Sequence, residues 1–242
     1  MTTVAGNPAG LYVHVPFCRQ KCRYCDFYSI PSTSLVTEWL DALKIEASLY
    51  KDRFPLFDTL YLGGGTPTLL ATEELGRLVE ILRGNFAICT DAEVSLEANP
   101  NDVTPEKLHF LRELGFNRIS LGAQSMVDSE LEFLGRTHTA RQAARAMARI
   151  RTSGFSGFGV DLIYGLPGQT EAEWSRTLQE TLAFAPNHVS CYQLTVSSAT
   201  PLWDMQEAGL FEPPDEDRER GLFLTASEVL EGQGFVHYEV SN

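Results

Sequence analysis

The sequence predicts an α/β fold with parallel strands, because short apolar runs alternate regularly with segments of helical periodicity. Six apolar, β-prone runs carry the pattern, at 11–15, 58–62, 92–97, 117–122, 158–163 and 188–194. Helical segments are expected near 34–53, 72–84, 104–114, 139–153, 170–184 and 215–232. Six such units fit either a partial (β/α)6 barrel or an open doubly wound sheet, and the pattern leaves both open.

Several expected helices carry start and stop signals. Thr104 is a typical N-cap residue, and Pro105 follows it at the first helical position. Thr170 stands three residues before Glu173, the spacing of a capping box. Two of the segments end in a glycine that favours helix termination, at Gly115 and Gly154.

The two ends of the chain depart from this alternation. Residues 1–10 are expected to form a short flexible tail, and 11–242 a single core domain. The closing run GFVHYEVSN alternates apolar and polar residues and predicts a strand. Because no turn follows that strand, we expect a C-terminal domain to be missing from this chain.

Composition and charge narrow the functional classes. The net charge of −13 argues against a surface that binds nucleic acid. No apolar run approaches the ~20 residues of a membrane span, and the N-terminus lacks the features of a secretion signal. Five cysteines without an export signal indicate a reducing compartment, so a cytoplasmic location is expected.

Three cysteines stand close together after the first β-prone run. Cys18, Cys22 and Cys25 span eight positions. Three thiolates on one loop can hold three irons of a 4Fe–4S cluster and leave the fourth iron open to a small molecule. A zinc site with a distant fourth ligand and unlinked buried cysteines remain alternatives. Cys89 and Cys191 lie in or beside apolar runs and are interpreted as small core residues.

Polar side chains stand near the ends of three successive β-prone runs. They are Glu97 in SLEANP, Gln124 in ISLGAQS and Asp161 in VDLIYGLPG. Ligands of parallel α/β folds bind at the carboxyl ends of strands, although any one of these residues alone would be interpreted as a local turn cap. As a set beside the cysteine loop, they predict one binding site.

The cysteine spacing carries a resemblance to a known superfamily. C-x3-C-x2-C behind a first strand, with Tyr24 before the last cysteine, resembles the signature of radical SAM proteins. In that superfamily the open iron binds S-adenosylmethionine, and one-electron reduction cleaves it to a 5′-deoxyadenosyl radical. The loop YLGGGTPTLL resembles the glycine-rich motif that contacts the methionine amino group, with Gly64, Gly65 and Thr66 matching. Without the resemblance, it would be an ordinary strand–helix loop.

A narrower resemblance covers nearly all of residues 10–242. The strings YVHVPFC, CDFYS, GGGTPT, SLEANP, ISLGAQS, LGRTH, DLIYGLPGQT and YQLT are similar to the oxygen-independent coproporphyrinogen III oxidase family, which includes a haem-chaperone branch. It implies a partial radical SAM barrel followed by a smaller helical domain. Residue by residue, it implies that Cys18, Cys22 and Cys25 are the cluster ligands. It also implies cofactor-binding side chains at Tyr12, Tyr24, Glu97, Gln124, Arg136 and Asp161. Among them, Arg136 would pair with the methionine carboxylate. From the residues alone, Arg136 would be a surface charge at a helix end, and no catalytic residue is assigned.

Two positions favour the chaperone branch. The oxidases carry another cysteine two residues after the last cluster ligand, where this chain has Phe27. Gln193 stands where the oxidases have a small residue, and it agrees with the chaperone branch. The first hypothesis is therefore a haem chaperone. The second is an oxidase that decarboxylates coproporphyrinogen III, and the third is an unrelated radical SAM enzyme.

The resemblance also implies partners. They are haem or a porphyrinogen, haem-accepting proteins and a one-electron donor such as flavodoxin or ferredoxin, and a homodimer is left open. None of the five histidines stands out as a haem ligand, and His138 is expected to cap a turn. A histidine motif of the branch lies in the expected C-terminal part, so residues 1–242 are expected to bind haem far more weakly than a complete protein.

Overall fold

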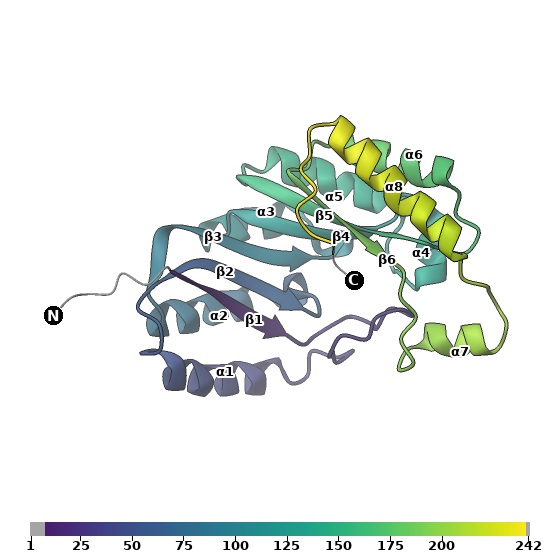
Figure 1. Cartoon of the computed structure of the whole chain (residues 1–242). Helices are drawn as coiled ribbons and strands as arrows, with labels where there is room; N and C mark the ends of the chain where they lie inside the picture. Colours follow the sequence, from purple (N-terminus) through teal and green to yellow (C-terminus); the bar gives the residue numbers. More distant parts are fainter. Residues whose placement is uncertain (1–7, 241–242) are drawn as a thin grey trace.

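The computed structural model describes residues 8–240 and contains one parallel six-stranded sheet. Its strands run in the order β1-β2-β3-β4-β5-β6, so each pairs with its neighbours in the chain (Figure 1). Their bounds are β1 Ala9–Val15, β2 Phe57–Gly64, β3 Ile88–Ala98, β4 Arg118–Gln124, β5 Gly157–Tyr164 and β6 His188–Gln193. All six expected strands are confirmed.

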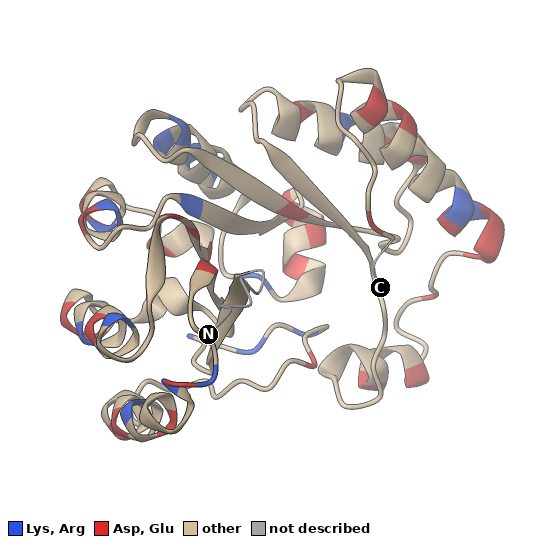
Figure 2. Ribbon diagram, turned by 60° about the vertical axis from the view of Figure 1, so that its left-hand side comes forward, with Lys and Arg blue, Asp and Glu red and all other residues tan. Residues whose placement is uncertain are grey.

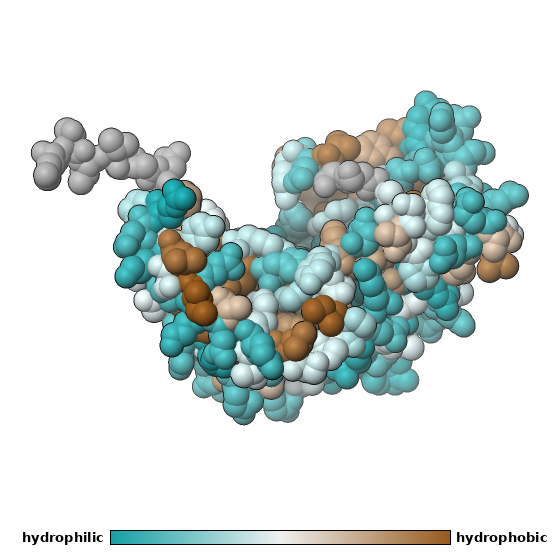
Figure 3. Space-filling view, turned by 90° about the horizontal axis from the view of Figure 1, so that it is seen from below, coloured by the Kyte–Doolittle hydropathy of each residue, from teal (hydrophilic) through white to brown (hydrophobic). Residues whose placement is uncertain are grey.

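The strand order decides between the two expected architectures. A doubly wound sheet reverses its order at a switch point, whereas this order never reverses. Successive right-handed crossovers place the connecting helices on one face, as Figure 1 shows. The partial barrel is therefore confirmed, with β1 and β6 as its two edges. Seen from below, the molecular surface is hollowed between its left-hand and right-hand parts (Figure 3).

All six expected helices are present. They are α1 Val36–Tyr50, α2 Thr72–Asn85, α3 Pro105–Glu113, α5 Ala140–Thr152, α6 Glu171–Leu182 and α8 Glu216–Gly232. The Thr104 side chain accepts a hydrogen bond from the amide of Lys107, and Thr170 and Glu173 form a capping box. Gly115 and Gly154 have φ angles of 90° and 81°, which confirms both stop signals. Two helices of seven residues, α4 Asp128–Leu134 and α7 Pro201–Glu207, are additional to those expected.

The two faces of the sheet differ in chemistry. Along β4, Ile119, Leu121 and Ala123 are buried and alternate with half-buried Ser120 and Gly122. The apolar set packs in the main core with helix residues such as Leu78, Leu111, Met147 and Trp174. The strands therefore turn apolar side chains toward the helices and polar side chains toward the open face.

The closing run of the chain was predicted to be a strand, and this prediction is wrong for the described residues. Val236, Tyr238 and Val240 are 80%, 71% and 77% exposed, and no strand is present from 233 to 240. An alternating pattern forms a strand only when a sheet edge pairs with its backbone. Here the tail reaches β6 through a side chain, since the Tyr238 hydroxyl lies 2.6 Å from His188 Nε2.

At the other end, β1 begins at Ala9, two residues before the expected strand, and residues 1–7 of the expected tail lie outside the described residues. Among residues 8–240, no helix has the length and apolar character needed to cross a membrane.

Candidate functional site

The predicted site residues converge on a cavity of about 560 Å³ at the carboxyl ends of the strands. Its lining includes Cys18, Cys22, Tyr24, Cys25, Gly64, Gly65, Thr66, Glu97, Gln124, Arg136 and Asp161. The structure does not bring Tyr12 into this lining. Its hydroxyl lies 3.1 Å from His14 Nδ1 on the open face of β1, and its ring stacks on Tyr61.

The cysteine loop is held from both sides. The amide of Cys18 donates to the carbonyl of Ile30 at 3.0 Å, and the amide of Arg23 donates to the carbonyl of Leu134 at 3.1 Å. A turn between Cys22 and Cys25 closes through a 3.3 Å backbone bond. All five cysteines are free thiols, and burial raises the pKa of the Cys25 thiol.

The cysteines of this loop fit a cluster better than a single ion. Within residues 8–240, no three His, Cys, Asp or Glu side chains converge closely enough to hold one metal ion. A mononuclear zinc site needs such convergence. In an iron–sulfur cluster each thiolate binds a different iron, so the three sulfurs line one cavity without meeting at a point.

The glycine loop packs directly against the chain before the cysteines. The amides of Gly65 and Thr66 donate to the carbonyls of Val15 and Phe17, both at 2.8 Å. A Cβ on Gly65 would lie 2.6 Å from the Phe17 carbonyl oxygen. Gly64 has a φ of +109°, and a Cβ there would lie 2.5 Å from the His14 ring. Close packing against Phe17 and His14 therefore requires glycine at both positions.

Glu97 connects the glycine loop to the sheet. Its Oε2 accepts from the amide of Gly64 at 3.0 Å, and its Oε1 accepts from the Tyr61 hydroxyl at 3.0 Å. Burial is the largest influence on this carboxyl and raises its pKa, although both hydrogen bonds act in the opposite direction. Glu97 thus fixes the loop whose residues line the cavity.

Arg136 lies beneath the cysteine loop rather than at the surface. Its Nη2 donates to the carbonyl of Gly122 at 2.8 Å, and its Nη1 lies 3.5 Å from both Cys22 Sγ and the Tyr24 hydroxyl. Its Nε is buried without a hydrogen-bond partner among the described residues. A buried unpaired donor is costly, so an anionic ligand such as a carboxylate suits this guanidinium. The interpretation as a surface charge at a helix end is wrong.

Asp161 and Gln124 complete the lining from β5 and β4. The Ser120 hydroxyl lies 3.3 Å and 3.1 Å from the two carboxylate oxygens of Asp161. Burial raises the pKa of Asp161, and hydrogen bonds from Ser190 and Ser120 oppose that rise. Gln124 has a φ of 67°, a conformation that a residue other than glycine seldom adopts and that concentrates at functional sites.

Sequence reasoning missed several residues that support this lining. Tyr61 and Ser120 stand on the open face of their strands, and their period-2 alternation with buried residues was the signal that could have identified them. Asn101 and Asp102 also line the cavity, from the loop that follows β3. Their contacts join segments far apart in the sequence, so no local pattern reveals them.

With this geometry established, comparison with known proteins decides the family. The radical SAM superfamily matches residues 12–181. This chain belongs to the radical SAM superfamily. Membership implies a 4Fe–4S cluster and S-adenosylmethionine, and the residues fit both, through three thiols on one cavity and an unpaired guanidinium donor beside them.

Curated relatives give a finer comparison. The chain is 37% identical over 248 residues to a protein of Mycobacterium tuberculosis named heme chaperone HemW, covering 100% of this chain and 64% of that protein. The heme chaperone HemW of Bacillus subtilis is 36% identical, with 96% of this chain and 62% of that protein covered. The chain therefore spans less than two thirds of the length of these relatives.

A solved structure supports the fold. Coproporphyrinogen III oxidase (HemN) from Escherichia coli, described as a radical SAM enzyme, superposes with a TM-score of 0.84 at 28% identity. The superposition covers 95% of this chain and 54% of the oxidase. The architecture of this radical SAM superfamily member is thus shared with an oxidase, whereas the more similar sequences are named chaperones.

Proposed function

We propose that this chain is the radical SAM core of a haem chaperone, which binds haem and transfers it to haem proteins. The observation that carries the proposal is the higher identity to proteins named heme chaperone, 37% and 36%, than to the oxidase, 28%. Phe27 supports the same choice, because it stands where the resemblance places an additional cysteine in the oxidases.

In this proposal, the residues of the cavity hold two cofactors. Cys18, Cys22 and Cys25 bind three irons of the cluster, and Arg136 pairs with the methionine carboxylate of S-adenosylmethionine. Gly64, Gly65 and Thr66 face the methionine amino group, while Glu97, Gln124 and Asp161 hold the polar parts of the cofactor. Once bound, the two cofactors supply one-electron chemistry. Tyr24, whose buried hydroxyl lies beside Arg136, closes the cavity next to the cysteines.

A second cavity offers room for a cargo. It measures about 890 Å³, lies between β6, α8 and residues 235–240, and falls in the size range of small-molecule sites. Tyr192 and Gln193 line both cavities, so a molecule held in the second would lie next to the cofactor site. This adjacency supports a tetrapyrrole beside the cluster, which residues 1–242 alone are expected to bind only weakly.

The second candidate function is oxidation of coproporphyrinogen III to protoporphyrinogen IX. The fold favours it specifically, because the oxidase superposes over nearly the whole chain. Radical chemistry at the cluster requires a one-electron donor, for which we propose a flavodoxin or ferredoxin in the cytoplasm. Haem-accepting proteins are the expected partners of the chaperone alone.

One experiment separates the two functions. A complete protein that includes the expected C-terminal part is reconstituted anaerobically with iron and sulfide, then incubated with reductant, S-adenosylmethionine and coproporphyrinogen III. The chaperone proposal predicts no protoporphyrinogen IX while absorption and spin-resonance spectra show an intact cluster, together with transfer of bound haem to an apo-haem protein. Product formation on a catalytic timescale would instead establish the oxidase.

A further inference from the structure

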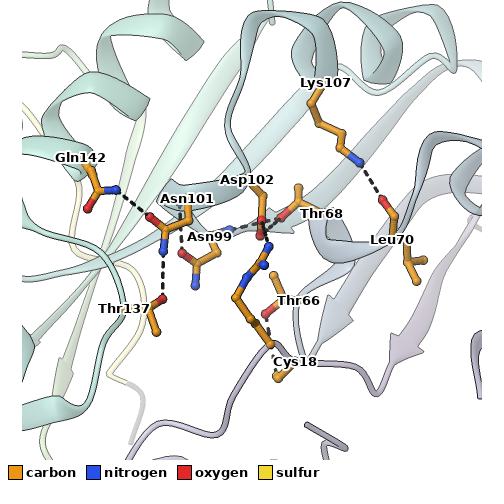
Figure 4. Close-up of polar contacts among 11 residues, drawn as sticks. Cys18, Thr66, Thr68, Leu70, Asn99, Asn101, Asp102, Lys107, Thr137 and Gln142 are labelled. Atoms are coloured by element: carbon orange, nitrogen blue, oxygen red, sulfur yellow. Dashed lines mark hydrogen bonds and ion pairs between the residues drawn. The ribbon is translucent and has the colours of Figure 1, made fainter. Parts of the chain in front are cut away.

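The loop that follows β3 contributes Asn99, Asn101 and Asp102 to the lining of the cavity. It contacts three other loops through side-chain hydrogen bonds (Figure 4). Asp102 Oδ1 accepts from Arg19 Nη2 at 3.1 Å, and its Oδ2 accepts from the Thr68 hydroxyl at 3.4 Å. Asn101 donates to the Thr137 hydroxyl at 2.9 Å and accepts from Gln142 at 3.1 Å. Residues 99–102 thus join the cysteine loop, the glycine loop and the loop before α5.

The contacts of Asp102 surround one cluster ligand. Arg19 directly follows Cys18, and Thr68 belongs to the segment whose Thr66 hydroxyl lies 3.8 Å from Cys18 Sγ. One carboxylate therefore restrains both segments that flank this sulfur. The side chain of Asp102 is only 10% exposed, whereas that of Arg19 is 64% exposed, so the buried partner is the fixed one.

Cys22 and Cys25 are restrained by different residues. Between them, Arg23 donates from its Nη1 to the carbonyls of Glu132 and Phe133, at 3.1 Å and 3.2 Å. Arg136 lies 3.5 Å from Cys22 Sγ. The segment around α4 therefore holds the centre of the cysteine loop. At its start, Asp102 adds a side-chain restraint to the backbone bond between the Cys18 amide and the Ile30 carbonyl. A multi-thiolate site needs all three sulfurs placed to within about 0.5 Å.

We propose that Asp102 is a positioning residue for the iron–sulfur cluster, which holds Cys18 in place through Arg19 and Thr68. This inference rests on the cluster site of the proposed function. It differs from an ordinary surface ion pair, which contributes little, because the carboxylate is nearly buried and holds two segments at once. Loss of the contact loosens the segment around Cys18 without removing any ligand, although the bond between the Cys18 amide and the Ile30 carbonyl remains.

The test compares iron release from matched variants after anaerobic reconstitution. Asp102→Asn removes the charge, and Arg19→Ala removes the exposed partner without touching buried structure. Asp41→Asn is the control, because Asp41 pairs with Arg77 between α1 and α2, away from the cavity. Iron transfer to a chelator is followed by absorbance, and the reduced cluster by spin resonance. Urea unfolding of the cluster-free forms gives the stability of the fold.

We expect Asp102→Asn and Arg19→Ala to release iron at least about threefold faster than the wild type, the size of effect that loss of one charge-assisted contact produces. Asp41→Asn should match the wild type. The double variant should be no faster than the faster single variant, because both remove the same contact. Arg19→Lys, which keeps the charge, should retain iron better than Arg19→Ala. The spin-resonance signal of the reduced cluster should broaden in the variants that lose the contact.

Specific outcomes would overturn the inference. Wild-type release rates in Asp102→Asn and Arg19→Ala would show that the contact does not position Cys18. Fast release in Asp102→Asn alone, with a matching loss of stability in the cluster-free form, would make Asp102 a residue of the fold only. If the wild type takes up no iron or sulfide, the cluster assignment of the proposed function fails as well, and the two failures are thereby distinguished.

Discussion

Replacement of His138 should change how the stability of the protein depends on pH. The side chain is only 3% exposed, and its Nε2 lies 3.0 Å from the carbonyl oxygen of Ala123, to which it donates. Burial and then the charge of Arg136 lower the pKa of His138 to about 4, from an ordinary value of 6.5. The folded protein therefore keeps this imidazole neutral under mildly acidic conditions.

The sign and size of the effect follow from the two pKa values. As the pH falls below 6.5, the unfolded chain takes up a proton on His138 while the folded protein does not, so the free energy of unfolding decreases. The loss stops near pH 4, where the folded state is also protonated. Integration between pH 8 and pH 5 gives a loss of about 2 kcal/mol, and about 3 kcal/mol when extended below pH 4.

Urea unfolding of the cluster-free protein at pH 8 and pH 5 tests this expectation, with His138→Gln as the comparison. Glutamine donates to the Ala123 carbonyl but does not titrate. The wild type should lose about 2 kcal/mol more than the variant between the two pH values. Buried carboxyls such as Glu97, Glu130 and Asp161 have raised pKa values and contribute with the opposite sign, but they are present in both proteins. Losses equal to within about 0.5 kcal/mol would refute the reasoning.

Three further outcomes are expected. Replacement of Cys18, Cys22 or Cys25 by Ala should abolish iron and sulfide binding, whereas Cys89→Ala should retain both, and unchanged metal content in all three variants would contradict the cluster. Gly64→Ala should destabilise the fold by at least about 1–2 kcal/mol and weaken S-adenosylmethionine binding measured by calorimetry, because its φ is +109° and His14 occupies the space of a Cβ. The matched change Gly84→Ala, in a helix with open space around it, should stabilise by about 0.5–1 kcal/mol. Absorbance titration should show that residues 1–242 bind haem far more weakly than a longer protein that includes the expected C-terminal domain. Equal haem affinity of the two proteins would argue against a haem site in that domain.

The fold was largely predictable because its signals are local. Each strand is a short apolar run and each major helix has a period and a cap, as the capping box of Thr170 and Glu173 illustrates. The alternation alone did not predict the strand order, since both candidate architectures share it, and only the resemblance selected the partial barrel. The closing run was predicted wrongly, because alternation indicates the capacity to pair but not the presence of a free edge that does so.

The candidate site was predictable to a lesser degree, and mostly through resemblance. The cysteine spacing and the polar strand ends marked the cavity from the residues themselves. No sequence pattern marked Arg136 as a site residue, because only the folded chain reveals that it lies under the cysteine loop. Asp102 gave no signal either, since its partners Arg19 and Thr68 are 83 and 34 positions away.

Gln124 shows why such a site depends on the residues around it. Between Gly122 and Gln124 the register of β4 against β5 shifts, so two residues of β4 oppose one of β5, which is a bulge that redirects a side chain. A left-handed residue here costs about 1–3 kcal/mol and persists only because its neighbours enforce it. Two side chains of one short loop supply that constraint, because Arg136 donates to the carbonyl of Gly122 and His138 to that of Ala123. The segment GRTH therefore holds two consecutive carbonyls of the bulge. The neutral His138 stabilises the same backbone that places Gln124 in the lining of the cavity, so protonation of this one imidazole should weaken the fold and the site together.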